Sequence, residues 1–184
     1  MNAILMQEAT GADLKFVFDY VKQRRGMNGV RTMLSMLNKP SIIFGSIGEI
    51  SRSQLYPEDI YKKVIETAAT VLGGDIKTRL NQIGYALGDR AKMTKFIAKF
   101  TTQRQLVRLI EDAVITDIPY VKTSSSDASK HIIILTVTAR KGGKAFLDVS
   151  DGYITALLDQ SNRAIAPAEK KVGEDEISYK FVVT

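Results

Sequence analysis

A strand followed by a glycine turn and a helix lies in the C-terminal third of the chain. Residues 131–140 are rich in isoleucine, valine and threonine, which favour a β-strand. Lys141-Gly142-Gly143-Lys144 follows, and residues 145–158 return to helical spacing. Because side chains alternate along a strand, one face carries His131, Ile133, Leu135, Val137 and Ala139, and the other carries Ile132, Ile134, Thr136, Thr138 and Arg140. Part of the core must therefore be built on a sheet.

Helical spacing of apolar residues dominates the first 117 residues. The clearest helix start is Tyr56-Pro57-Glu58-Asp59, with proline at the first helical position and two carboxylates at the positive end of the helix dipole. Residues 41–50 fit either an apolar loop or a short buried helix. The other stripes cover residues 14–24, 30–37, 75–88, 93–100 and 101–114. Together these patterns predict about six helices.

The character of the chain changes at Pro119, which ends the helices. A short strand over 118–123 and a polar loop over 123–129 are expected before the strand at 131–140. Two strands after the helix at 145–158 complete the chain. The predicted class is α+β, with a helical part (1–117) and an αβ part (118–184) in strand-strand-helix-strand-strand order. Residues 1–184 are expected to form a single domain.

Composition excludes several classes of protein. The chain has 184 residues, of which 45% are hydrophobic and 25% charged, as in ordinary globular domains. No apolar run approaches the ~20 residues of a membrane span, and no secretory signal is evident, so a cytoplasmic location is expected. The absence of cysteine rules out disulfides, iron–sulfur clusters and thiolate zinc sites.

The net charge of +6 is concentrated around one basic segment. Its bases are Arg90, Lys92, Lys95, Lys99, Arg104 and Arg108. The segment could contact phosphates, acidic lipid or an acidic protein, but a solvated helix face is the favoured interpretation. Nucleic-acid binding is not expected, because Phe96 and Phe100 fit a core better than a stacking platform.

Three stretches carry a resemblance to a known family. They are Leu55-Tyr56-Pro57-Glu58-Asp59-Ile60-Tyr61, Arg140-Lys141-Gly142 with Phe146, and the terminal strand from Asp175 to Val183. In this order and spacing they resemble the haem nitric-oxide/oxygen-binding (H-NOX) domains. They also resemble haem-free relatives of those domains: the 4-vinyl reductase domains, a myxobacterial paralogous family and the TRAPP vesicle-tethering subunits.

The resemblance bears directly on haem. Haem-binding members carry a proximal histidine on the helix before the proline, and the corresponding position here falls at or near Glu111. Their propionate-binding Tyr-x-Ser-x-Arg motif corresponds to Thr136-x-Thr138-x-Arg140, which keeps only the arginine and one hydroxyl. His131 is the only histidine, and strand alternation points it away from those residues. No haem or other cofactor is therefore expected.

Neither catalysis nor a metal site is predicted. The lone histidine has no serine and acid at recognisable spacing, and no calcium-loop pattern is present. The Lys141–Lys144 turn lacks a nucleotide-binding loop layout, so its glycines are better interpreted as serving a tight turn.

The leading hypothesis is a non-catalytic sensory module that binds a small hydrophobic or amphipathic ligand without haem. By resemblance, its pocket would lie between the N-terminal helices and the sheet face of Thr136, Thr138 and Arg140, with Glu111 on the adjoining helix. The first alternative is a TRAPP-like protein-interaction or scaffold domain that forms a homodimer. The second alternative is a haem-based sensor of NO or O2 with an unusual axial ligand.

Overall fold

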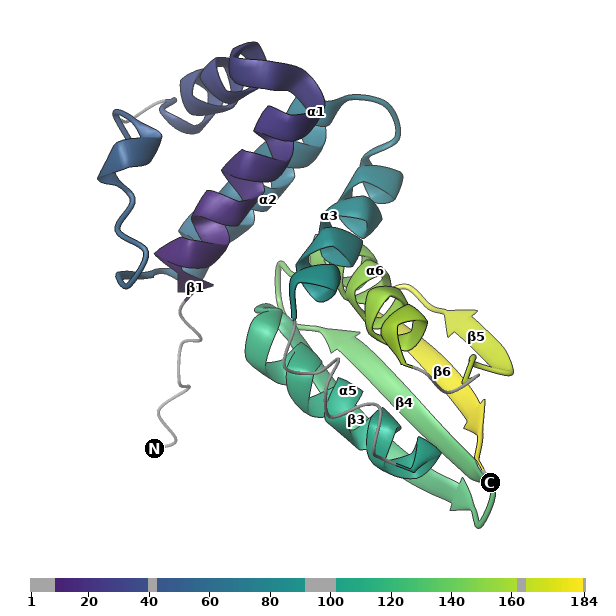
Figure 1. Cartoon of the computed structure of the whole chain (residues 1–184). Coiled ribbons are helices and arrows are strands. Elements are labelled where there is room, and N and C mark those ends of the chain that lie inside the picture. The colour runs from purple at the N-terminus through teal and green to yellow at the C-terminus, as the bar shows by residue number, and fades with distance from the viewer. Residues whose placement is uncertain (1–8, 40–42, 92–101, 162–164, 184) are drawn as a thin grey trace. The chain divides into compact units, whose positions relative to one another are not determined.

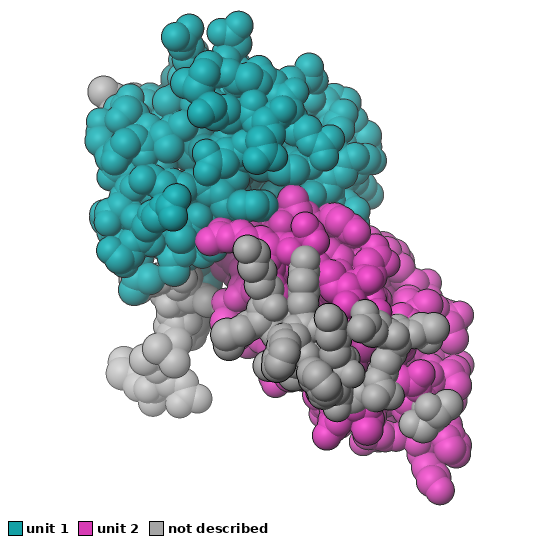
Figure 2. Space-filling model, in the orientation of Figure 1, with its two compact units in different colours: residues 1–83 teal, residues 84–184 magenta. Residues whose placement is uncertain are grey.

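Two compact units make up the chain. A computed structural model describes residues 9–39, 43–91, 102–161 and 165–183 (Figure 1). The units are Met1–Ile83 and Gly84–Thr184 (Figure 2). The boundary falls earlier than the expected change at residue 117, so the helix that precedes the sheet belongs to the same unit as the sheet. That the two units form a single domain stays a prediction.

The N-terminal unit is helical, with one small pair of strands. Its elements are β1 (Ala9–Thr10), α1 (Gly11–Leu37), the 3₁₀ helix η1 (Ile47–Glu49), β2 (Leu55–Tyr56), α2 (Glu58–Leu72) and the first half of α3 (Ile76–Arg90). β1 and β2 pair antiparallel, Ala9 with Tyr56. The sequence did not predict this pair, because two residues are too few for a visible alternation. The ambiguous stretch 41–50 contains η1 and the buried Phe44 and Ile50.

α1 and α2 pack along one another and form the core of this unit. Their buried faces include Leu14, Val17, Phe18, Val21, Tyr61, Val64, Ile65 and Ala68. The Phe44 ring meets Phe18 and Tyr56 edge-on, with centroids 6.4 and 5.8 Å away. Of the two helices predicted before residue 38, the structure makes one element that is interrupted at Gly26, whose φ is 66° and ψ is −168°. α2 ends at Gly73, whose φ of 72° is typical of glycine at a helix C-terminus.

The C-terminal unit confirms the predicted α+β order. It contains α5 (Gln103–Asp117), β3 (Val121–Ser129), β4 (Ile132–Ala139), α6 (Lys144–Gln160), β5 (Glu169–Val172) and β6 (Glu176–Val182). The antiparallel sheet has the spatial order β3-β4-β6-β5. The four described ranges contain five α-helices. Four of them precede the sheet, where about six were expected, and α6 lies between β4 and β5 along the chain. The helix predicted for 93–100, together with Lys92, Lys95 and Lys99, lies outside the described residues.

β3 corrects the prediction of a polar loop at 123–129. The strand continues to Ser129, because every residue from Val121 to Asp127 faces a partner on β4, from Val121 opposite Ala139 to Asp127 opposite Ile133. Pairing with a neighbouring strand outweighs the weak strand preference of serine. The strand predicted to end at residue 123 therefore runs along the edge of the sheet.

One face of this sheet is buried. Ile133, Leu135 and Val137 on β4 are fully buried, and they face Phe181, Tyr179 and Ile177 on β6. Both α5 and α6 cover this face, because Glu111 of α5 bonds to Ser125, opposite Leu135, and Asp151 of α6 bonds to Tyr179. The alternation predicted for β4 is thus confirmed.

The second half of α3 packs closely against α6. A methyl group at Gly84 would collide with the carbonyl oxygen of Val149, and one at Gly88 would lie 2.7 Å from that of Tyr153. Glycine at these positions lets the two helix backbones approach. Within the described residues, no helix is both long enough and apolar enough to cross a membrane.

Candidate functional site

Thr136 and Thr138 lie on the sheet face that α5 and α6 leave uncovered. Thr136 is opposite Ser124 on β3 and Ser178 on β6, and Thr138 is opposite Lys122. Thr136 is half-buried and Thr138 exposed. This face therefore carries a row of hydroxyl groups across three strands, beside the half-buried Ile134.

Arg140 follows directly after β4, in the turn that leads to α6. Its backbone N–H donates to the Tyr120 carbonyl at 2.7 Å, and its own carbonyl accepts from the Gly143 N–H at 2.8 Å. The residue is half-buried and its Nε atom is buried. These bonds fix the backbone from which the guanidinium group extends.

The turn after Arg140 depends on its two glycines, as predicted, but for different reasons. Gly142 has a φ of 78°, which favours glycine. Gly143 has an ordinary φ of −97°, but a methyl group there would collide with the Tyr120 carbonyl oxygen. Tyr120 itself has a φ of 64°, and its ring stacks on Phe146 with centroids 5.2 Å apart. Tyr120 therefore stabilises the turn twice, through its backbone carbonyl at Arg140 and through its ring at Phe146.

Glu111 lies on the opposite side of the sheet from the two threonines. Its carboxylate accepts the Ser125 backbone N–H at 3.1 Å and the Ser125 hydroxyl, and Arg108 Nη1 is 4.0 Å away. Ser125 shares the face of Leu135, whereas Thr136 and Thr138 share the other face. The expectation that Glu111 lines one pocket with the threonines is thus corrected. The expectation was wrong because the register of β3 on β4 puts Ser125, and with it Glu111, on the buried face of the sheet. The sequence did not define that register.

A partly buried polar cluster that sequence reasoning missed joins α6 to the sheet. Asp151 accepts the Tyr179 hydroxyl at 2.7 Å and the Lys170 ammonium at 2.6 Å. Burial raises the pKa of Tyr179, and the Asp151 carboxylate adds to this shift. The phenol therefore acts as a hydrogen-bond donor and not as a base. Tyr179 lies inward with its β6 neighbours Ile177 and Phe181, but nothing in the sequence paired it with Asp151.

Two bases of the basic segment, Arg104 and Arg108, pair with acids of their own unit. Arg104 forms an ion pair with Asp127 and donates to the Lys130 carbonyl at 2.7 Å. Arg108 lies 3.5 Å from the same Asp127 carboxylate. These pairs support the interpretation of a solvated helix face for Arg104 and Arg108.

Among the comparisons with known proteins, the one with solved structures identifies a fold. No family model matches the chain and no curated protein matches its sequence. Among solved structures, an H-NOX protein from S. oneidensis in the Fe(II)NO ligation state matches with a TM-score of 0.66 and 16% identity, over 95% of this chain and 99% of that one. A T. tengcongensis H-NOX mutant matches with a TM-score of 0.63 and 9% identity, over 95% and 97%. A Cs H-NOX mutant matches with a TM-score of 0.64 and 10% identity, over 95% and 96%.

The chain has an H-NOX-like fold. The suspected resemblance is thus confirmed for the fold. Sequence identities of 9–16% support a shared fold and nothing further. Whether the residues of this H-NOX-like chain suit haem is a separate question.

The helix before Pro119 does not suit haem ligation. Haem iron in proteins is held by histidine, cysteine, methionine or tyrosine. α5 contains none of these residue types, and Glu111 on it is bonded to Ser125. His131 is exposed in the turn between β3 and β4, where its carbonyl accepts from the Val183 N–H at 2.9 Å. In the described ranges, no three carboxylates or histidines gather as a metal site would require.

Proposed function

We propose that this chain is a non-catalytic, H-NOX-like sensory module that binds a small hydrophobic or amphipathic ligand and does not hold haem. One observation carries the proposal. On the helix that would carry the axial ligand, the carboxylate of Glu111 is bound to Ser125, and α5 carries none of the residue types that hold haem iron. The H-NOX-like fold supports a ligand-binding role, and α5 argues against haem as that ligand.

The uncovered sheet face suits an amphipathic ligand. Ile132 and Ile134 are half-buried there, beside the hydroxyls of Thr136 and Thr138. We assign the polar end of the ligand to these hydroxyls and to the Arg140 guanidinium, which recognises carboxylate or phosphate oxygens. The apolar part of the ligand would lie along the isoleucines.

Glu111 takes a different role in this proposal. Its two bonds to Ser125 tie α5 to β3, so it positions the helix and does not contact the ligand. The absence of catalysis is part of the same proposal. Among the described residues, the exposed His131 bonds to the Ser129 hydroxyl through its backbone N–H, and its ring makes no hydrogen bond to a hydroxyl.

Native mass spectrometry of the purified protein tests this proposal. A co-purified small molecule is expected on the native chain, and it should be lost in a T136V/T138V double variant and in R140Q. T155V is the matched control, since Thr155 is exposed and its hydroxyl bonds to its own helix, at the Asp151 carbonyl. Circular dichroism checks that each variant folds.

Three outcomes would contradict the proposal or the site assigned in it. A stable dimer that carries no ligand would favour the TRAPP-like interaction domain. A Soret band after expression with added haem would favour the haem-based sensor. Retention of the ligand in both R140Q and T136V/T138V would remove the uncovered sheet face as its site.

A further inference from the structure

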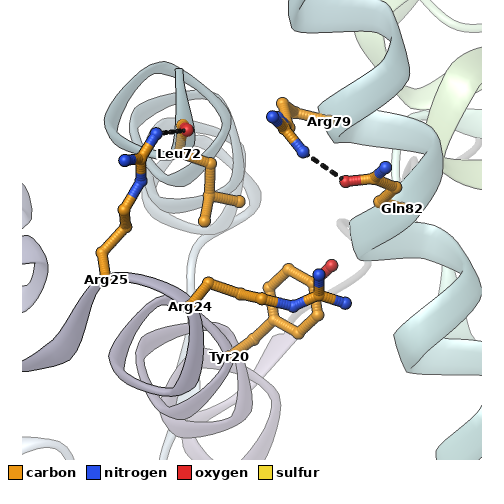
Figure 3. A pocket seen from close by; sticks show the side chains of 6 residues that line it. All are labelled: Tyr20, Arg24, Arg25, Leu72, Arg79 and Gln82. Carbon is orange, nitrogen blue, oxygen red and sulfur yellow. Dashed lines mark hydrogen bonds between the residues drawn. The ribbon is translucent and has the colours of Figure 1, made fainter. Parts of the chain in front are cut away.

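A hollow of about 180 Å³ in the N-terminal unit is lined by three arginines (Figure 3). Its lining residues are Tyr20, Arg24, Arg25, Leu72, Arg79 and Gln82. They come from α1, from the end of α2 and from the first turns of α3. This volume is much larger than the roughly 15 Å³ that one water molecule needs.

Two of the arginines are anchored to the end of α2. Arg25 donates through Nη2 to the Leu72 carbonyl, and Arg79 donates through Nε to the Gly73 carbonyl at 2.6 Å. The last carbonyls of a helix lack partners within the helix, so these bonds hold both guanidinium groups in place. Figure 3 shows Arg25 beside Leu72, and Arg79 directed at Gln82.

The glycines after α2 make room for this arrangement. A methyl group at Gly73 would lie 3.1 Å from Arg25 Nη2, and one at Gly74 would lie 3.3 Å from Arg79 Nη2. Both glycines also have a positive φ, of 72° and 82°. The turn therefore brings the two guanidinium groups close to the backbone.

The third arginine is held by a ring. The Arg24 guanidinium carbon lies 5.2 Å from the centroid of the Tyr20 ring, and α1 carries both residues. This contact orients the guanidinium plane and leaves its N–H groups available to a ligand. Arg24 therefore adds positive charge to the hollow but, unlike Arg25 and Arg79, makes no hydrogen bond to the end of α2.

The charge of the hollow is not balanced by acids. Across the described ranges, no ion pair involves any of these three arginines, and no carboxylate lines the hollow. The C-terminal dipole of α2 supplies only about half a negative charge, against three positive ones. The remaining positive charge attracts an anion to the hollow.

Most of the hydrogen-bonding groups that remain are donors. Each guanidinium has five N–H groups, of which Arg25 uses one and Arg79 uses two in bonds within the protein. The amide oxygen of Gln82 accepts from Arg79 Nη1 at 2.8 Å, which leaves its NH2 group as a further donor. A ligand with several acceptor oxygens and negative charge matches this set.

We infer that this hollow binds a phosphate dianion, either inorganic phosphate or the terminal phosphate of a small phosphomonoester. Arginine forks bind phosphate oxygens in pairs, and anchored arginines lose little entropy when the anion arrives. Tyr20 and Leu72 are only 7% and 4% exposed, so they give the organic part of a monoester a small apolar contact in the lining of the hollow. The inference concerns residues of the N-terminal unit only and is independent of the ligand proposed for the sheet.

Thermal unfolding and calorimetric titration with inorganic phosphate test the inference, with chloride keeping the ionic strength constant. The midpoint of unfolding should rise with phosphate concentration, because a ligand that binds the folded state stabilises it. R24Q should bind phosphate about tenfold more weakly, since it removes a charge-assisted contact. Because Arg24 makes no bond to α2, R24Q should unfold at nearly the native midpoint when phosphate is absent.

R31Q is the matched control, since Arg31 is exposed on the same helix and does not line the hollow. R79K keeps the charge but loses the planar fork, so it should also weaken binding. Phenyl phosphate distinguishes the two sources: tighter binding than inorganic phosphate supports a monoester, and equal binding supports the free ion. The inference is overturned if neither compound binds more tightly than chloride, or if R24Q and R31Q bind phosphate equally.

Discussion

The carboxylate of Glu111 accepts hydrogen bonds from both the backbone N–H and the hydroxyl of Ser125, and thereby joins α5 to β3. The serine lies opposite Leu135, on the buried face of the sheet. The helix that would carry an axial haem ligand is thus fixed to the sheet by a structural contact.

Disrupting this contact should destabilise the C-terminal unit. E111A leaves the Ser125 N–H and hydroxyl without their acceptor, so the free energy of unfolding in urea should fall by about 1–3 kcal/mol. D112N is the control, since Asp112 is exposed on the same helix. A double-mutant cycle with S125A should give a coupling energy of about 0.5–3 kcal/mol. Additive effects would show that the two residues do not interact.

Gly84 should not tolerate any side chain. In G84A the new methyl group would meet the Val149 carbonyl, so α3 and α6 must separate, at a cost of about 1–3 kcal/mol in unfolding free energy. G48A is the control, because a methyl group there would meet only the Ser46 hydroxyl, at 3.4 Å. Equal midpoints of thermal unfolding for G84A and the native chain would contradict the close packing of the two helices.

Tyr179 should make stability fall at high pH. Its pKa is raised from 10.0 by burial and by Asp151, so the folded state keeps the phenol proton after the unfolded state has lost it. The stabilisation is complete below pH 10 and declines as the pH rises above it, by up to about 1.4 kcal/mol per pH unit.

Urea unfolding of the native chain and of Y179F between pH 8 and about 11 measures this effect. Y179F should show a shallower decline above pH 10. Y85F is the control: the pKa of Tyr85 is also raised, by its bond to Asp159, but its hydroxyl is exposed. Parallel pH curves for Y179F and the native chain would exclude Tyr179 as the cause.

Thr102 should anchor the start of α5. Its hydroxyl accepts the Gln105 N–H at 3.2 Å, and the Gln105 side chain accepts the Thr102 N–H at 2.9 Å, which is a complete capping box. T102A should lower the free energy of unfolding by about 1 kcal/mol, and T102S should retain most of it. Chemical denaturation followed by circular dichroism compares the variants. Equal losses in T102A and T102S would assign the effect to packing of the threonine methyl.

Local patterns defined most elements of this chain before any contact was known. The alternation of residues 131–140 became β4, with Ile133, Leu135 and Val137 inside. Gly73 ended α2, and Pro57 preceded its first turn. These features depend on neighbours a few residues apart, and a sequence displays such neighbours directly.

Elements that depend on distant partners were misjudged. The serines of β3 resembled a loop because their strand preference is weak, and only pairing with β4 satisfies their backbone groups. The pair β1 and β2 joins segments that are more than forty residues apart. No local pattern records such a pairing.

The sequence by itself determined the strand-strand-helix-strand-strand order after Pro119, the two faces of β4 and the lack of a histidine on the helix before Pro119. Only the tertiary structure decided that Glu111 and Thr136 lie on opposite sides of the sheet, and that Arg24, Arg25 and Arg79 meet in one hollow. The physical reason is the same in both cases. Strand register and helix packing are fixed by burial and hydrogen bonding between residues far apart in the chain.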